Sequence, residues 1–246
     1  MNLGLYLGAA ALGAMERWQE ATSHNIAASS SPGFRKREVE FSMQAAGPSP
    51  AAGTGGTPAV GPMMFPSSRV SISFQPGQFV GTGRDLDVAI RGEGFFEVQT
   101  AEGNRAYTRA GSFYTNPERT LVDAQGNVLL GEGGAPIQLL PEGGSLAIAP
   151  DGTLSQDGRQ IGRLTVQRFD NNQALIPLAG GLFAANGQAP QTVEVPELMQ
   201  GALETSNVQP VGEMVNLIQI TRAYEAAQKV ITSRDDILDK TIRAVG

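Results

Sequence analysis

The stretch VQPVGEMVNLIQITRAYEAAQKVITSRDDILDKTIRA, residues 208–244, predicts a long amphipathic helix. Pro210 and Glu213 suit its first turn, where the N–H that proline lacks is not needed and a negative charge interacts favourably with the helix dipole. Such a helix needs a partner, because packing of the apolar face supplies most helical stability in proteins. Two heptad series form its expected seam: Leu217, Tyr224, Ile231, Leu238 and Val245, alternating with Met214, Thr221, Gln228, Asp235 and Ile242.

Residues 3–28 form a second expected helix, and it is the obvious partner of the first. Pro32 and Gly33 follow the end of this helix, where proline cannot continue it and glycine is free to turn. The apolar run at residues 3–15 is too short to span a bilayer and has no positive segment before it, so we expect it to stay uncleaved. Its seam alternates spacings of three and four: Leu5, Gly8, Leu12, Met15, Gln19, Thr22 and Ile26.

The C-terminal helix also carries a second apolar flank. Val211, Val215 and Ile218 lie beside the seam and are not needed for a two-helix hairpin. A helix that is apolar on more than one side requires more than one neighbour. We therefore expect the chain to associate with other copies or with related chains.

The region between the helices reads as strands and turns. The chain has 31 Gly and 15 Pro in 246 residues, which fits many short strands joined by tight turns. Residues 95–98 and 106–109 flank the turn sequence at 101–104 and predict a hairpin. The expected fold class is therefore α+β: paired terminal helices in a coiled-coil-like arrangement, and a mainly antiparallel β domain with a barrel-like or sandwich-like form.

Residues 44–66 are almost wholly Ala, Gly, Pro, Ser and Thr. Such a composition cannot fold alone, so the segment is either a flexible linker or an extended segment ordered by its neighbours, and the linker is favoured. The expected organisation has three parts. Residues 1–40 and 206–246 form a discontinuous helical assembly domain, residues 41–68 a linker, and residues 69–205 the β domain.

Composition argues against several classes of function. The net charge of −6 without a basic cluster disfavours nucleic acid, and the absence of cysteine excludes disulfides and thiolate metal sites. The single histidine, His24, comes without the second histidine or the cysteine that a metal site or catalytic dyad would use, so a surface or interface role is favoured. Neither glycine-rich run, at 92–94 or 131–134, opens a helix that could cradle phosphate. Five carboxylates read as turn residues instead of a catalytic or calcium site: Asp85, Asp87, Asp123, Asp151 and Asp157.

We therefore expect neither enzyme activity nor a cofactor. The alternative from another class of function is a secreted β-domain enzyme or glycan-binding module whose two terminal helices pair only with each other.

Several short motifs along the chain resemble those of one known protein family. HNIAASSSPGFR (residues 24–35) resembles the N-terminal signature of bacterial flagellar rod and hook axial proteins, and GALETSNV (residues 201–208) resembles their C-terminal signature. Between them, residues 86–90, 94–96 and 107–113 are similar to β-domain motifs of the same family. Ala28 replaces an asparagine usual in the family, so Asn25 stands alone in its motif.

The resemblance implies a structural subunit of a hollow helical shaft that transmits torque. Its terminal helices would line the export channel, and the chain would be exported through the flagellar type III apparatus without cleavage. Length and the runs at 129–134 and 148–164 look most like a proximal-rod subunit within the periplasm; a distal-rod or hook subunit is the alternative. The implied partners are other rod subunits and copies of the chain itself, with neither nucleic acid nor membrane insertion. The implied assembly interface comprises Leu5, Leu12, Met15, Asn25, Ile26, Pro32, Gly33, Phe34, Asn207, Met214, Leu217, Ile218, Tyr224, Ile231, Leu238 and Ile242.

Overall fold

The computed structural model describes the backbone of residues 3–46 and 63–245 and the side chains of residues 8–43, 67–233, 237, 240 and 243. The chain divides into two compact units. The helical unit contains residues 3–27, 37–73 and 209–245 within this range, and the β unit contains residues 28–36 and 74–208. The fold class is α+β, as the sequence predicted, with two long helices and many antiparallel strands.

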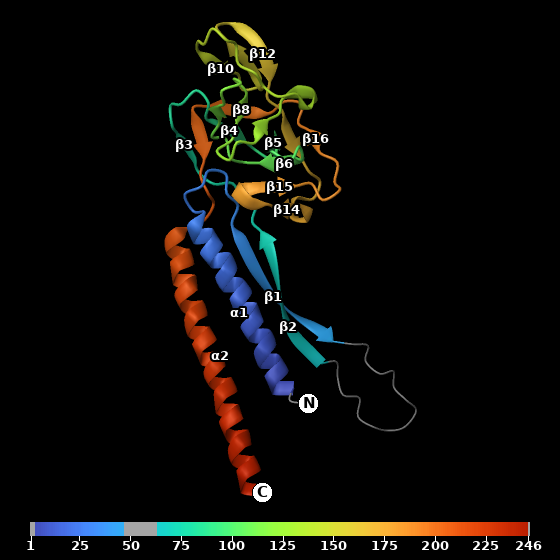
Figure 1. Cartoon of the computed structure of the whole chain (residues 1–246), viewed down its shortest axis with the longest axis vertical. Coiled ribbons are helices and arrows are strands. Elements are labelled where there is room, and N and C mark those ends of the chain that lie inside the picture. Colours follow the sequence, from blue (N-terminus) through green and yellow to red (C-terminus); the bar gives the residue numbers. More distant parts are fainter. Residues whose placement is uncertain (1–2, 47–62, 246) are drawn as a thin grey trace, which may run out of the picture. The chain divides into compact units, whose positions relative to one another are not determined.

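Two antiparallel helices form much of the helical unit. Helix α1 covers Leu3–Ala27 and helix α2 covers Pro210–Val245, and the two run side by side (Figure 1). A Cβ added at Gly8 would lie 3.2 Å from the Ile231 side chain, so the helices approach closely at this point. The absence of a side chain at Gly8 permits this approach.

A two-stranded hairpin completes the helical unit. Strands β1 (Arg37–Ala46) and β2 (Met63–Ile72) pair along their full length. Helix α1 packs on this hairpin, with Arg17 donating to the Ser68 carbonyl and Trp18 in edge-to-face contact with Phe41 at 5.6 Å. The strands reach into residues 41–68, the range expected to be a linker. Residues 41–46 and 63–68 are instead an extended segment ordered by neighbours, while residues 47–62 lie outside the described part.

The β unit is built from short antiparallel ladders. Its longest ladder follows the order β14-β15-β6-β5-β9-β8-β7, with β13 joining β5 to β16; β10-β11-β12, β17-β4 and β18-β3 form smaller sheets. The strands are β3 (Phe79–Gly81), β4 (Val88–Arg91), β5 (Phe95–Gln99), β6 (Arg105–Thr108), β7 (Tyr114–Thr115), β8 (Leu121–Val122), β9 (Val128–Leu129), β10 (Leu146–Ile148), β11 (Thr153–Gln156), β12 (Arg159–Arg163), β13 (Val166–Arg168), β14 (Ile176–Pro177), β15 (Leu182–Ala184), β16 (Gln191–Thr192), β17 (Glu197–Gln200) and β18 (Ala202–Glu204). Three 3₁₀ turns cover Glu132–Gly134, Asn172–Ala174 and Ala179–Gly181.

The expected hairpin is confirmed, because β5 pairs with β6 across the turn at 100–104. The barrel that the sequence allowed is wrong: within the described residues the long ladder starts at β14 and ends at β7, and these two strands do not pair. Many of its strands have only two or three residues, which is too little continuous pairing to close a sheet on itself.

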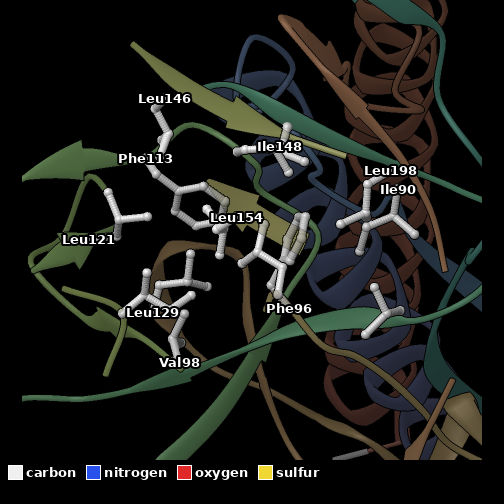
Figure 2. Packing of buried hydrophobic residues seen from close by; sticks show 14 of the residues in the cluster. Ile90, Phe96, Val98, Phe113, Leu121, Leu129, Leu146, Ile148, Leu154 and Leu198 are labelled. Atoms are coloured by element: carbon white, nitrogen blue, oxygen red, sulfur yellow. The ribbon is translucent and has the colours of Figure 1, made fainter. Parts of the chain in front are cut away.

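The core of the β unit gathers side chains from several of these ladders. Figure 2 shows Phe96, Phe113 and Leu154 pointing toward one another, and each is at most 1% exposed. The rings of Phe96 and Phe113 meet edge to face at 5.2 Å, a favourable arrangement for aromatic pairs. Phe96 of β5 and Leu154 of β11 belong to different ladders, so this packing joins the ladders into one unit.

Candidate functional site

Two segments of the β unit run together where the chain leads into and out of it. We call residues 33–36 and 204–207 the neck. The Gly33 amide donates to the Glu204 carbonyl at 2.8 Å, and the Asn207 amide donates to the Phe34 carbonyl at 3.4 Å. The Asn207 side chain accepts from the Lys36 amide at 2.7 Å. The two terminal signatures, far apart in sequence, are therefore hydrogen-bonded to each other.

A buried ion triad lies beside these hydrogen bonds. The Glu204 carboxylate contacts Arg35 Nη1 at 2.8 Å and Arg109 Nε at 2.8 Å, and all three side chains are at most 3% exposed. The Gly77 amide also donates to Glu204 at 2.9 Å. Buried charges require such pairing, because an isolated charge taken out of water is strongly unfavourable.

Arg109 also holds the turn between β4 and β5. Its Nη1 donates to the Gly94 carbonyl at 2.6 Å, and its Nη2 donates to the Ile90 and Gly92 carbonyls at 3.0 and 2.8 Å. Burial lowers the pKa of Arg109, although Glu204 opposes that shift. Burial raises the pKa of Glu204, but the attraction of Arg109 and Arg35 outweighs it and leaves that pKa below its ordinary value.

Gly33 has a backbone that no other residue fits. Its φ is +67°, and a Cβ at this position would lie 2.3 Å from the carbonyl carbon of Arg109. Glycine is therefore required by both the left-handed conformation and the close approach of the main chain. Of the neighbouring predicted interface residues, Phe34 is buried and Pro32 is half-buried.

In the helical unit, Asn25 connects the end of α1 to β1 and α2. Its side chain accepts from the Arg37 amide and donates to the Arg37 carbonyl, both at 2.8 Å. The same amide nitrogen donates to the buried Glu213 carboxylate at 3.2 Å. One asparagine thus satisfies three groups without a second asparagine in the motif.

The seam between the helices follows one of the two expected series. Leu217, Tyr224 and Ile231 are half-buried, as are Leu12, Met15 and Ile26 of α1. In the alternate series the burial is shifted by one residue: Glu213 and Ile220 are buried, whereas Met214 and Thr221 are exposed. The Asn25–Glu213 contact is compatible only with this rotation of α2. The side chains of Leu5, Leu238 and Ile242 lie outside the described residues.

The opposite side of α2 presents an apolar face. We define the α2 face as Val211, Met214, Val215 and Ile218, whose spacing places them in one stripe. Val211 is 76% exposed and Ile218 is 54% exposed. At 3.6 residues per turn, this stripe lies across the helix from the buried Ile220. The second flank predicted from the sequence is therefore open to solvent in the single chain.

The turn interpretation agrees with the hydrogen bonds of Asp123 and Asp151, but not with those of Asp87, which is buried in a β-bridge and accepts from Thr82 Oγ1. Asp123 accepts from the amides of Gln125 and Asn127, and Asp151 accepts from the Thr153 amide. Within the part of the chain that the structure describes, three or more His, Cys, Asp or Glu side chains never gather where they could hold a metal ion. Neither described helix is long and apolar enough to cross a membrane.

Sequence reasoning missed the triad, and with it Arg109 and Glu204, although both lie inside the quoted motifs. The sequence nevertheless contains a feature from which the ion pairing of Arg109 and Glu204 could have been predicted. Each is a charged residue within a strand or at its end, flanked by residues that read as buried, and such a charge needs an opposite charge nearby.

Comparison with known proteins shows the family. The domain described as flagellar hook protein FlgE/F/G D1 matches residues 89–156, and the one described as flagellar basal body rod FlgEFG protein C-terminal matches residues 199–244. The chain is 34% identical to the flagellar basal-body rod protein FlgF of Caulobacter vibrioides, over 100% of this chain and 99% of that protein. It is 32% identical to FlgF of Salmonella typhimurium (96% and 95% covered) and to the rod protein FlgG of Bacillus subtilis (98% and 98%). The chain therefore belongs to the family of flagellar basal-body rod proteins, which is structural and not enzymatic.

Proposed function

We propose that this chain is a structural subunit of the flagellar basal-body rod, and specifically of its proximal part. The observation that supports this proposal is the apolar α2 face, which is exposed in the single chain although Ile220, on the other side of the same helix, is buried. Exposed apolar patches of this kind mark protein–protein interfaces. The full-length similarity to rod proteins named FlgF supports the rod as the destination.

The proposed assembly uses the terminal helices. Residues 1–40 and 206–246 form the assembly domain, with α1 and α2 paired in a coiled-coil-like manner, and the β unit forms a sandwich-like body. The α2 face packs against a helix of a neighbouring subunit, either another copy or a related axial protein. Other members of the implied interface, such as Asn25 and Asn207, act by fixing the segments from which the helices and the neck are built.

The proposal includes the route to the rod. The chain is exported uncleaved through the flagellar type III apparatus, and its α2 face packs against neighbouring subunits in the periplasm. Lack of cysteine supports this route, because a chain without thiols cannot form wrong disulfides in an oxidising compartment.

Basal bodies test the proposal directly. The tagged full-length chain is expressed in cells that lack the native copy, and isolated basal bodies are examined by immunoblot. We expect the wild-type chain in the rod fraction, and a variant with Val215→Asp and Ile218→Asp absent from it in non-motile cells. Gln228→Asp, on an exposed part of α2 outside the stripe, is the matched control and should incorporate. Absence of the wild-type chain from basal bodies would overturn the proposal.

A further inference from the structure

The last stretch of the β unit, residues 197–207, pairs with parts of the chain that come long before it. Among the described strands, β4 pairs only with β17 of this stretch, in a register that sets Leu198 opposite Ile90. In the same way, β3 pairs only with β18. We call residues 197–207 the closing segment, because they complete two sheets whose other strands lie far earlier in the sequence.

The closing segment also covers part of the apolar core. Strand β4 is deeply buried, since Val88, Ala89 and Ile90 are each at most 2% exposed. Leu198 of the closing segment belongs to the same core and is 4% exposed. Without the closing segment, β4 would lose the strand that it pairs with, and this part of the core would be open to water. Exposure of apolar surface to water opposes folding.

One side chain of the closing segment bonds to two further parts of the β unit. Gln200 Oε1 accepts from the Ile148 amide at 3.0 Å. Gln200 Nε2 donates to the Leu146 carbonyl at 2.7 Å and to the Asp85 carbonyl at 2.8 Å. Strand β10 and the turn before β4 are therefore both hydrogen-bonded to the closing segment.

The end of the closing segment supplies the anion of the ion triad. Arg35 and Arg109 both contact Glu204, and both side chains are at most 3% exposed. A chain in which Glu204 has not yet reached them cannot bury these two guanidinium groups, because a buried charge without an opposite charge is strongly unfavourable. The triad therefore requires both ends of the β unit at once.

We infer that the β unit is unstable until the closing segment pairs with it, and that it then folds as a single unit. Synthesis adds about 5–20 residues per second, so the chain around β4 waits on the order of 10 s for β17. The same property suits the proposed export, and this use of it rests on the proposed function. Whichever end of the β unit emerges first, it cannot fold until the other end has followed.

Hydrogen exchange on the full-length free chain tests the inference. The amides of β5 and β6, which pair with each other and not with the closing segment, are compared with those of β4 and β17. In the wild type, we expect the opening equilibria of all four strands to agree within about tenfold and to have the same urea dependence. The physical reason is that no state with a detached closing segment and an otherwise folded β unit is populated above the unfolded state.

A substitution in the closing segment extends the test. Leu198→Ala removes a buried side chain, so the amides of β4, β5, β6 and β17 should all exchange at least about thirtyfold faster. Leu178→Ala is the matched control, because Leu178 lies outside the closing segment and is 40% exposed, and it should change the rates by less than about threefold. If Leu198→Ala does not fold, the wild-type rates and their urea dependence decide the question.

A larger difference among the four strands of the wild type would overturn the inference, because β5 and β6 would then stay folded without the closing segment. Faster exchange in β4 and β17 alone in the Leu198→Ala variant would also overturn it. The measurement uses the free chain, so its result is independent of rod incorporation, which tests the proposed function.

Discussion

Replacing Glu204 by glutamine should strongly destabilise the β unit. The substitution keeps the shape and an oxygen that accepts from the Gly77 amide, but it removes the carboxylate that contacts both Arg35 and Arg109. Both guanidinium groups then remain buried without a counter-charge. Breaking a buried ion pair in this way costs about 3–5 kcal/mol. That is a large share of the roughly 5–15 kcal/mol by which native domains are stable.

Thermal and urea unfolding of the full-length chain, followed by circular dichroism of the β signal, measure this effect. At the size of the β unit, 1 kcal/mol lowers the midpoint by about 3 °C, so we expect a fall of roughly 10–15 °C. Glu197→Gln is the matched control, because Glu197 is an exposed glutamate on β17 and its replacement should change stability by less than about 0.5 kcal/mol.

A double-mutant cycle separates the triad from general packing. Adding Arg35→Met to the Glu204→Gln variant removes one unpaired charge, so its effect there should differ from its effect in the wild type by about 0.5–3 kcal/mol. A loss below about 1 kcal/mol for Glu204→Gln alone, or additivity in the cycle, would refute the conclusion that Glu204 neutralises two buried cations.

Further predictions concern the same residues and the helical unit. The pKa of Glu204 is lowered in the folded state, so its stabilisation should be complete above the ordinary glutamate pKa of about 4.3 and be lost as the pH falls further; urea midpoints should decline less steeply below that pH in Glu204→Gln. Asn25→Ala should destabilise the helical unit by about 1–3 kcal/mol, seen as a lower midpoint of the helical signal, because both Arg37 main-chain groups lose their partner. Gly33→Ala should cost more than the roughly 1–2 kcal/mol of a left-handed L-residue, because its Cβ meets main chain; Gly103→Ala, with φ +82° in open space, should show only that smaller cost in the same assay.

Sequence patterns over a few neighbouring residues predicted the structural elements that short-range interactions determine. The two helices, the β5–β6 hairpin and the turn role of Asp151 followed from periodicity and turn chemistry, and the structure agrees with each. The side of α2 that is buried could not be predicted from the sequence pattern. Met214 and Glu213 are neighbours in sequence, and only the contact with Asn25 decides which of them faces inward.

Contacts between residues far apart along the chain could not be predicted from the sequence. The β1–β2 hairpin includes residues whose composition resembles a linker, and their order depends on a partner strand and on the Trp18 contact from α1. The ion triad joins residues 35, 109 and 204, and no spacing along the chain indicates that these three meet.

The triad also explains why each terminal signature contains a charged residue, Arg35 in one and Glu204 in the other. A buried ion pair is weak evidence for stability, since well-packed apolar residues often do as well, and its best-attested role is to fix one register against others. At the neck, a slip of one residue between 33–36 and 204–207 would turn the Glu204 side chain to the opposite face of its segment. Arg35 and Arg109 would then be buried without an anion, and the Lys36 amide would lose the Asn207 oxygen. Such a slip therefore leaves unpaired charge in the interior, and this penalty favours the observed pairing of the two signatures.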